Sequence, residues 1–248
     1  MTSPVPSIHP QLAFRVSLVA GLVILALTVM SALQSPVRPC GELREGYAPI
    51  VAFELARDAA DLNALFGRPG DPCRAEVIER MDAINWIDVL VFIPVYGVFV
   101  AFFFAGMRAS APRLARLGVQ ITIIACLGDY AENTCLMQLT PALDARSIWL
   151  ALLPWATGVK WLGLGVAAGI AALIFAKTRA QAWWHIPVAL ACAVALLVTV
   201  ATLAAPRAFG PILSPAIGLS WLAFLLTAAI RAFRRGPAQR GETVFPAS

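Results

Sequence analysis

Charged residues are scarce in this sequence. They make up 13% of its 248 residues, whereas 60% of the residues are hydrophobic, and the mean hydropathy is +0.78. Soluble domains typically contain about 25% charged and about 45–50% apolar residues. A soluble fold of this length could not bury such an excess of apolar side chains, so lipid must cover most of the surface. We therefore expect an all-α polytopic membrane helix bundle, with residues 1–248 forming a single transmembrane domain.

Histidine is also rare, and several motifs of catalysis are missing. His9 and His185 are the only histidines, which excludes a zinc centre with three histidine ligands. The sequence has no Gly-x-Ser-x-Gly elbow and no phosphate-binding loop. The spacing of Gly165 and Gly169 does not fit a dinucleotide fingerprint and is typical of a close helix-packing face, which we expect within the chain rather than in a dimer. We predict no cofactor and no metal.

Six apolar stretches are long enough to cross a bilayer, whose apolar core of about 30 Å requires about 20 residues of helix. The predicted spans are 14–34, 86–107, 118–138, 148–176, 186–205 and 213–233. The first could instead be a cleaved signal peptide, because Ser31-Ala32-Leu33 resembles a cleavage region. Its apolar run is longer than the usual 7–15 or so residues of a signal peptide, however, which favours a retained helix.

Basic residues are concentrated on one side of these spans, which predicts the orientation. The short loops and the tail on that side contain Arg108, Arg113, Arg116, Lys177, Arg179, Arg231, Arg234, Arg235 and Arg240, whereas the two short loops opposite contain Arg146 and Arg207. The positive-inside rule then places both termini in the cytoplasm and residues 35–85 outside it. Because these basic residues lie at the ends of apolar stretches, the net charge of +5 does not indicate nucleic-acid binding. The preference for arginine over lysine suggests a bacterial protein, and hence the cytoplasmic (inner) membrane.

Residues 35–85 form the only sizeable segment outside the predicted spans, and they contain two cysteines. Cys40 and Cys73 lie there, whereas the other three cysteines lie within apolar spans. Two cysteines in an oxidising compartment, with none left over, predict a disulfide, and two free thiols are the alternative.

The same segment carries the pattern of an amphipathic helix. Apolar residues recur at helical spacing from Val51 to Phe66, while Glu54, Asp58 and Asp61 occupy another face. We expect one helix that ends at Gly67, acting either as a lid over an outward-facing cavity or as a structural cap.

Three acids lie within the predicted spans, and a lysine lies near the middle of one of them. Asp88 is near the outer end of the second span. Asp129 and Glu132 are in the outer half of the third, and Lys160 is near the middle of the fourth. Each ionised group at the bilayer centre costs at least about 2.5–3.5 kcal/mol on insertion scales, so such groups face the bundle interior and need partners. The predicted depths of Asp129 and Lys160 differ by only several Å, within reach of a lysine side chain. Asn133 shares the helix face of Asp129 and Glu132.

A polar stripe also runs down the second predicted span. Asp82, Asn85 and Asp88 follow one another at three-residue intervals. Tyr96 lies deeper in the span, beside Pro94 and Gly97, where we expect a kink or an opening of the helix. The predicted binding or proton-relay site consists of Asp88, Tyr96, Asp129, Glu132, Asn133 and Lys160.

This constellation is compatible with three functions. The first is a non-enzymatic protein that binds or moves a proton, a cation or a small amphipathic solute through an outward-opening carboxylate–lysine pocket. The second is an intramembrane enzyme that acts on a lipid or isoprenoid, with one carboxyl as general acid and another as base. The third is an accessory subunit with a structural ion pair. We favour the first, because no nucleophile or metal site supports an enzyme. Membrane lipid is the expected partner, and the sequence leaves open a small-molecule or ion ligand and a homo-oligomer.

Overall fold

The molecule is a bundle of long helices, and its computed structural model describes residues 9–33 and 37–233. In these ranges six helices are long and apolar enough to cross a membrane, which confirms the predicted fold class and the six spans. The elements are α1 (Pro10–Leu33), α2 (Pro49–Glu54), α3 (Ala59–Phe66), α4 (Arg74–Ile87), η1 (Asp88–Phe92), α5 (Ile93–Gly106), η2 (Met107–Ala109), α6 (Pro112–Leu139), α7 (Ile148–Lys177), η3 (Arg179–Gln181), α8 (His185–Ala204) and α9 (Pro206–Ala232).

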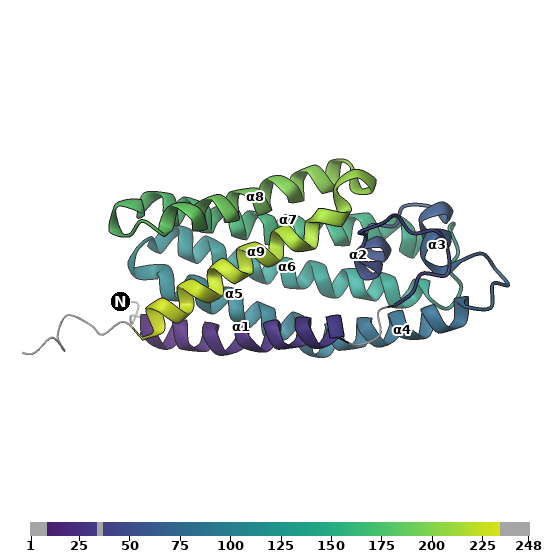
Figure 1. The fold of residues 1–248 in the computed structure, drawn as a ribbon, viewed down its shortest axis with the longest axis horizontal. Coiled ribbons are helices and arrows are strands. Elements are labelled where there is room, and N and C mark those ends of the chain that lie inside the picture. Colours follow the sequence, from purple (N-terminus) through teal and green to yellow (C-terminus); the bar gives the residue numbers. More distant parts are fainter. Residues whose placement is uncertain (1–8, 34–36, 234–248) are drawn as a thin grey trace, which may run out of the picture.

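The spanning helices run along the long axis of the molecule, and α2 and α3 lie together at one end of it (Figure 1). We call α2 and α3 the cap, and this end of the bundle the cap end. The start of α1 and the end of α9 lie at the opposite end (Figure 1). Which end faces the cytoplasm stays a prediction, and Arg234, Arg235 and Arg240, on which the prediction partly depends, lie outside the described residues.

The second span is longer than predicted. It forms a continuous helix of 36 residues from Arg74 to Ala109, so helix begins well before residue 86. At 1.5 Å per residue this helix is about 54 Å long, which exceeds the apolar thickness of a bilayer by about 20 Å. The extra turns are α4, whose Val77 and Met81 pack with Phe66 of α3 in a buried apolar cluster. Packing against the cap thus accounts for the helical turns that a count of apolar residues does not predict.

The sixth span also begins earlier than predicted, at Pro206 rather than at 213. Proline is suited to the first turn of a helix, where its missing N–H is not needed. Pro211 lies inside α9 and cannot donate to the carbonyl of Arg207 four residues earlier. The side chain of Arg44 donates to this carbonyl instead. The long loop before the cap therefore supplies the hydrogen bond that the proline removes.

The segment predicted as one amphipathic helix is two short helices. α2 ends at Glu54, and Asp58 starts α3 as its N-cap, with its carboxylate accepting hydrogen bonds from the backbone N–H groups of Ala60 and Asp61 at 2.9 and 3.0 Å. The chain turns at Asp58, the N-cap residue of α3, between the two helices. Glu54 therefore does not share the exposed face of Asp58 and Asp61. The predicted end at Gly67 is confirmed.

A covalent bond holds the loops around the cap together. The sulfur atoms of Cys40 and Cys73 form a disulfide, with Cα atoms 5.6 Å apart, which is the pair predicted from the sequence. Cys40 precedes the cap and Cys73 directly precedes α4, so the bond closes the chain that contains α2 and α3. The ends of the cap segment are therefore tied to each other independently of the helices between them.

Two apolar clusters fill the bundle: one lies at the cap end, and the other extends from the opposite end as far as Val51 and Leu55 at the cap. The cluster at the cap end includes Phe53, Phe66 and Leu136. The other includes Phe103 and Phe224, whose rings stack with centroids 4.2 Å apart. Along α6 and α7, the buried Asp129, Glu132 and Lys160 lie between residues of the two clusters. The charged groups are thus surrounded above and below by hydrocarbon.

The glycines of α7 pack as predicted. A Cβ atom at Gly165 would lie 2.8 Å from Thr199, and one at Gly169 would lie 2.7 Å from Leu196, both on α8. These distances are shorter than van der Waals contact, so the two glycines allow α7 and α8 to approach closely. The Gly165-x-x-x-Gly169 motif therefore serves packing within the chain.

Candidate functional site

Lys160 of α7 lies at the centre of a buried charged site. Its ammonium Nζ is 2.7 Å from Glu132 Oε1, 2.9 Å from Glu54 Oε1 and 3.0 Å from Asp129 Oδ1. The exposed fraction of each of these four side chains is 7% or less. We call Glu54, Asp129, Glu132 and Lys160 the carboxylate–lysine cluster. The ammonium donates hydrogen bonds to Glu54 and Glu132 and forms an ion pair with Asp129.

Helix α6 supplies two of the carboxylates, Asp129 and Glu132, and the glycine beside them, Gly128, lets the helix approach α7 closely. Asp129 and Glu132 are three residues apart, hence on one face of the helix. A Cβ atom at Gly128 would lie 2.7 Å from the backbone nitrogen of Lys160, so this glycine allows α6 to approach α7 at the level of the cluster. Substitution of Gly128 would push the two carboxylates away from the ammonium.

The two helices also place their charges at the same depth. Asp129 lies 17 residues after the start of α6 at Pro112, and Lys160 lies 17 residues before the end of α7 at Lys177. Each is therefore about 26 Å from the end opposite the cap. The offset of several Å expected from the sequence is absent, because α6 begins at Pro112, six residues earlier than the predicted start at 118. The lysine side chain reaches its partners without leaving their level.

The third carboxylate, Glu54, comes from the cap rather than from a spanning helix. Its Oε2 accepts a hydrogen bond from Trp161 Nε1 at 3.1 Å, and its backbone carbonyl accepts one from Thr157 Oγ1 at 2.9 Å. Helix α2 thereby docks onto α7 through both the side chain and the main chain of one residue. Burial raises the pKa of Glu54 above its ordinary value, and the nearby Lys160 ammonium opposes this rise.

Glu54 is the residue of the cluster that the sequence did not predict. Its helical spacing with Asp58 and Asp61 put it on a solvent-facing polar stripe, and the break between α2 and α3 invalidates this placement. The sequence contains a signal for this break, because Asp58 is a typical N-cap residue and Asp61 would place an acid in the first turn of a helix that follows it. That signal would have ended the first helix near Glu54 and removed it from the stripe.

Hydrogen bonds extend the cluster toward α5 and η1. Tyr96 OH donates to Asp129 Oδ2 at 2.9 Å. The amide nitrogen of Asn133 lies 3.1 Å from Asp129 Oδ1 and 2.9 Å from Asp88 Oδ2, so Asn133 links Asp88 to the cluster. The structure thus brings all six predicted site residues into one connected network. Their roles in binding or proton relay stay a prediction.

Asp88 lies at an irregular turn of the second span. Residues Asp88–Phe92 form a π-helical segment, in which the N–H of Ile93 donates to the carbonyl of Asp88 five residues earlier. Pro94 has no N–H and therefore cannot donate an α-helical hydrogen bond. The π-helical turn lies directly before this proline. The opening expected around Pro94 takes this form. Single π-helical turns inside α-helices are frequent at functional sites.

The charges of the cluster do not balance. Three ionised carboxylates and one ammonium sum to −2, and Asp88 would bring the sum to −3. Lys160 cannot neutralise this excess, and the described residues within hydrogen-bond distance supply only neutral donors, Trp161, Tyr96 and Asn133. In a site of low dielectric such a surplus favours retention of at least one proton on the carboxylates.

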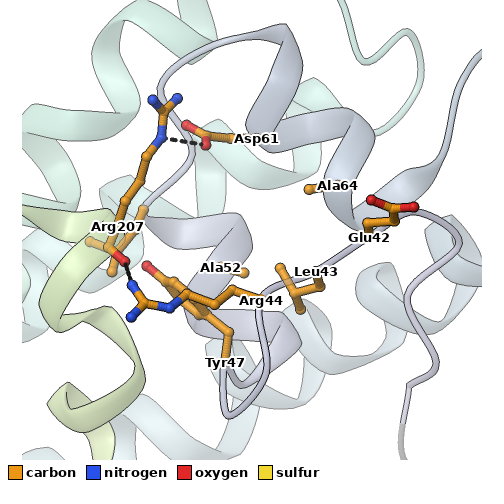
Figure 2. Close-up of a pocket in the computed structure, with 9 residues that line it drawn as sticks. Glu42, Leu43, Arg44, Tyr47, Ala52, Asp61, Ala64 and Arg207 are labelled. Atoms are coloured by element: carbon orange, nitrogen blue, oxygen red, sulfur yellow. Dashed lines mark hydrogen bonds and ion pairs between the residues drawn. The ribbon is translucent and has the colours of Figure 1, made fainter.

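The two described pockets lie away from the cluster. One, of about 250 Å³, lies between the loop before the cap, the cap itself and the start of α9 (Figure 2). Figure 2 shows the ion pair between Arg207 and Asp61, in which Nε and Oδ1 are 3.1 Å apart. Arg207 also forms an ion pair with Asp58, in which Nη2 and Oδ2 are 2.7 Å apart. The other, of about 550 Å³, is an almost wholly apolar groove between α1 and α5. No member of the cluster lines either pocket.

The cluster is an ion-pair site in which three carboxylates surround one ammonium. Within the part of the chain that the structure describes, no group of three or more histidine, cysteine, aspartate or glutamate side chains is arranged to hold a metal ion. The three carboxylates contact the Lys160 ammonium at 2.7 to 3.0 Å. The fold and the site define a polytopic membrane helix bundle with a buried carboxylate–lysine cluster. Comparison with known protein families, curated proteins and solved structures finds no match.

Proposed function

We propose that this protein binds and releases protons at the carboxylate–lysine cluster, as part of proton-linked binding or transport across the membrane. The observation that carries the proposal is the contact of one buried ammonium with three carboxylates within 3.0 Å. A structural ion pair needs one acid for one base. The excess of acid creates sites whose occupancy by a proton, or by a competing cation, depends on conditions at the membrane surface.

The position of Glu54 gives the proposal a mechanism. Glu54 lies on the cap, whereas the other members of the cluster lie on spanning helices. Protonation of Glu54 weakens its attraction to Lys160 and hence one of the contacts that hold α2 in place. Proton binding and movement of the cap are then linked, as in a lid, and a solute site could open beneath it. The predicted outward-opening pocket belongs to this state.

The cellular setting of the proposal follows from the basic residues. We place the protein in the bacterial cytoplasmic membrane, surrounded by lipid, with the cap outside the cell. Arg108, Arg113 and Arg231 lie at the helix ends opposite the cap, which supports this orientation. In this orientation the cap faces the side from which an energised bacterial membrane supplies protons.

Infrared spectroscopy tests proton binding directly. The wild-type protein in lipid should show a protonated carboxyl band near neutral pH, and Glu132→Gln should diminish it. Asp144→Asn is the matched control, because Asp144 is an exposed acid in the loop between α6 and α7. Absence of a protonated carboxyl band in the wild type between pH 5 and 9 would refute the proposal.

Flux through proteoliposomes tests transport. With a pH-sensitive dye inside and an imposed proton gradient, wild type and Asp144→Asn should acidify the lumen faster than protein-free liposomes when the transported solute is present. Glu54→Gln and Glu132→Gln should abolish this difference. Candidate solutes are screened in the same assay, beginning with small cations. A protonated carboxyl band without any coupled flux would support proton binding at the cluster and refute proton-linked transport.

A further inference from the structure

Asn85 is a fully buried amide for which the described residues offer no hydrogen-bond partner. Its exposed fraction is 0%, and neither its Oδ1 nor its Nδ2 atom has a partner in the described part of the chain. A buried polar group left unsatisfied costs about 1–3 kcal/mol. Such groups in folded proteins usually mark a bound water, an ion or a functional site. Asn85 lies on α4, between the cap end and the cluster.

The same helix face carries further polar groups at regular intervals. Asp82, Asn85 and Asp88 are spaced by three residues, so they share one face of the helix. Asp88 accepts a hydrogen bond from Asn133 on α6, which shows that this face is directed at α6. Asp82 Oδ1 is buried and, like Asn85, has no partner among the described residues.

The row of polar groups formed by Asp82, Asn85 and Asp88 continues into the carboxylate–lysine cluster. Glu132 Oε2 and Asn133 Oδ1 are also buried and without a partner in the described residues. Glu132 Oε1 of the same carboxylate is 2.7 Å from the Lys160 ammonium. From Asp82 to Glu132 there is thus a sequence of polar atoms with free hydrogen-bonding capacity. It leads from the cap end of α4 to the proton-binding carboxylates.

Water is the ligand that these atoms suit. An amide has both donors and acceptors and stays neutral at every pH, so Asn85 can hold a water in either orientation. Buried waters typically make about three hydrogen bonds with otherwise unsatisfied polar groups. A chain of hydrogen-bonded waters conducts protons, because each water can accept one proton and pass on another. Bare cations would require several ligating oxygens about one point, and the row is linear along a helix.

We propose that water held by Asn85 between Asp82 and Asp88 forms the route by which protons reach the carboxylate–lysine cluster from the cap end. This inference rests on the proposed proton binding and adds its path. The route follows α4 beside the cap, so protons can enter while Glu54 keeps α2 docked. Asn85 is a positioning residue in this route, since it orients water and exchanges no proton of its own.

Site-directed labelling tests whether the route is wet. Asn85→Cys in nanodiscs of phosphatidylcholine should react with a small positively charged methanethiosulfonate, scored on the peptide that contains residue 85. Two controls share the helix: Met81→Cys replaces a fully buried apolar side chain, and Leu90→Cys replaces one that is 66% exposed on the outer surface of the bundle, where lipid covers it. We expect Asn85→Cys to react at least ten times faster than both. Reaction no faster than Met81→Cys, or no faster than Leu90→Cys, overturns the route.

Deuterium exchange tests whether the route carries protons. After transfer into deuterated buffer, the buried carboxyl band should shift at least ten times more slowly in Asn85→Leu than in the wild type, with its initial intensity unchanged. Asn85→Ser, which keeps a group that binds water, should exchange within about threefold of wild type. Equal rates in wild type and Asn85→Leu would contradict the route alone. Absence of the band in the wild type would contradict proton binding and the route together.

Discussion

Removal of the central base is the sharpest perturbation that the cluster allows. Lys160→Met keeps the length of the side chain and deletes the ammonium that contacts three carboxylates. Loss of one partner of a buried ion pair typically costs about 3–5 kcal/mol, because the remaining charge is left without compensation. Here three acids lose the same partner. We therefore expect the free energy of unfolding to fall by about 3–5 kcal/mol above neutral pH.

The loss should depend on pH in a direction set by Glu54. Burial raises the pKa of Glu54 above its ordinary value of 4.5, and Lys160→Met removes the main effect that opposes the rise. A group whose pKa is higher in the folded state stabilises the fold below its unfolded pKa, and this contribution is lost as the pH rises through the folded pKa. The variant should therefore be most stable near pH 4.5 and lose stability at higher pH, whereas the wild type should change less.

A second substitution should restore stability, and which acid is changed should matter. Glu132 has one oxygen on Lys160 and another without a partner in the described residues. Asp129 keeps Tyr96 and Asn133 as donors after the lysine is gone. We expect Glu132→Gln to recover about 2 kcal/mol in the Lys160→Met background, and Asp129→Asn less than about 1 kcal/mol, within the usual range of coupling energies.

Unfolding in mixed detergent micelles from pH 4.5 to 9 measures these differences. Lys177→Met is the matched control, because Lys177 is the other lysine of the chain and is exposed at the end of α7, so its loss should change stability by less than about 0.5 kcal/mol. Strictly additive effects of the two substitutions, or a Lys160→Met variant whose stability loss is independent of pH, would refute the argument that these groups form one coupled site.

Four further outcomes follow from the structure. Replacing both Cys40 and Cys73 by serine should cost about 3–4 kcal/mol by the chain-entropy estimate, and mass spectrometry of non-reduced peptides should find the two linked. Arg207→Gln should leave the melting temperature nearly unchanged, because its ion pairs are exposed to solvent and therefore screened. Tyr96→Phe should cost about 1.5–3 kcal/mol, the usual value of a hydrogen bond to a charged group, and an unchanged melting temperature would contradict this. Single cysteines introduced at 108–117 should resist an impermeant thiol reagent in intact cells, and their labelling from outside would invert the proposed orientation.

The spanning helices and most of the cluster could be predicted from the sequence because the membrane imposes simple rules. Long apolar stretches must be helices, and the scarce charges within them must meet partners. This basis alone places Lys160 and the two acids of α6 in one site, and the structure brings them together. Helical spacing then added Asn133 by its shared face, and Tyr96 by its place on the second span. These inferences need only local periodicity and the cost of burying a charge.

The remaining features depend on contacts between segments far apart in the chain. Glu54 is 106 residues from Lys160, and nothing in its own neighbourhood indicates an intramembrane partner. The extension of α4 beyond the apolar stretch depends on packing against α3, and the early start of α9 depends on hydrogen bonds from the loop before the cap. Local patterns set the intrinsic preference at each of these places, and tertiary packing decided the outcome.

The origin of Glu54 on the cap has a consequence for biosynthesis. The cap is synthesised before α6 and α7, so Glu54 leaves the ribosome long before its lysine partner. Helix α7 must enter the membrane with a charge that costs at least about 2.5–3.5 kcal/mol on insertion scales, offset at first only by the acids of α6. The cap can dock only after both helices are in place. Assembly of the cluster thus waits for the insertion of α7, and a chain that lacks α7 should be left with its cap undocked and open to quality-control proteases.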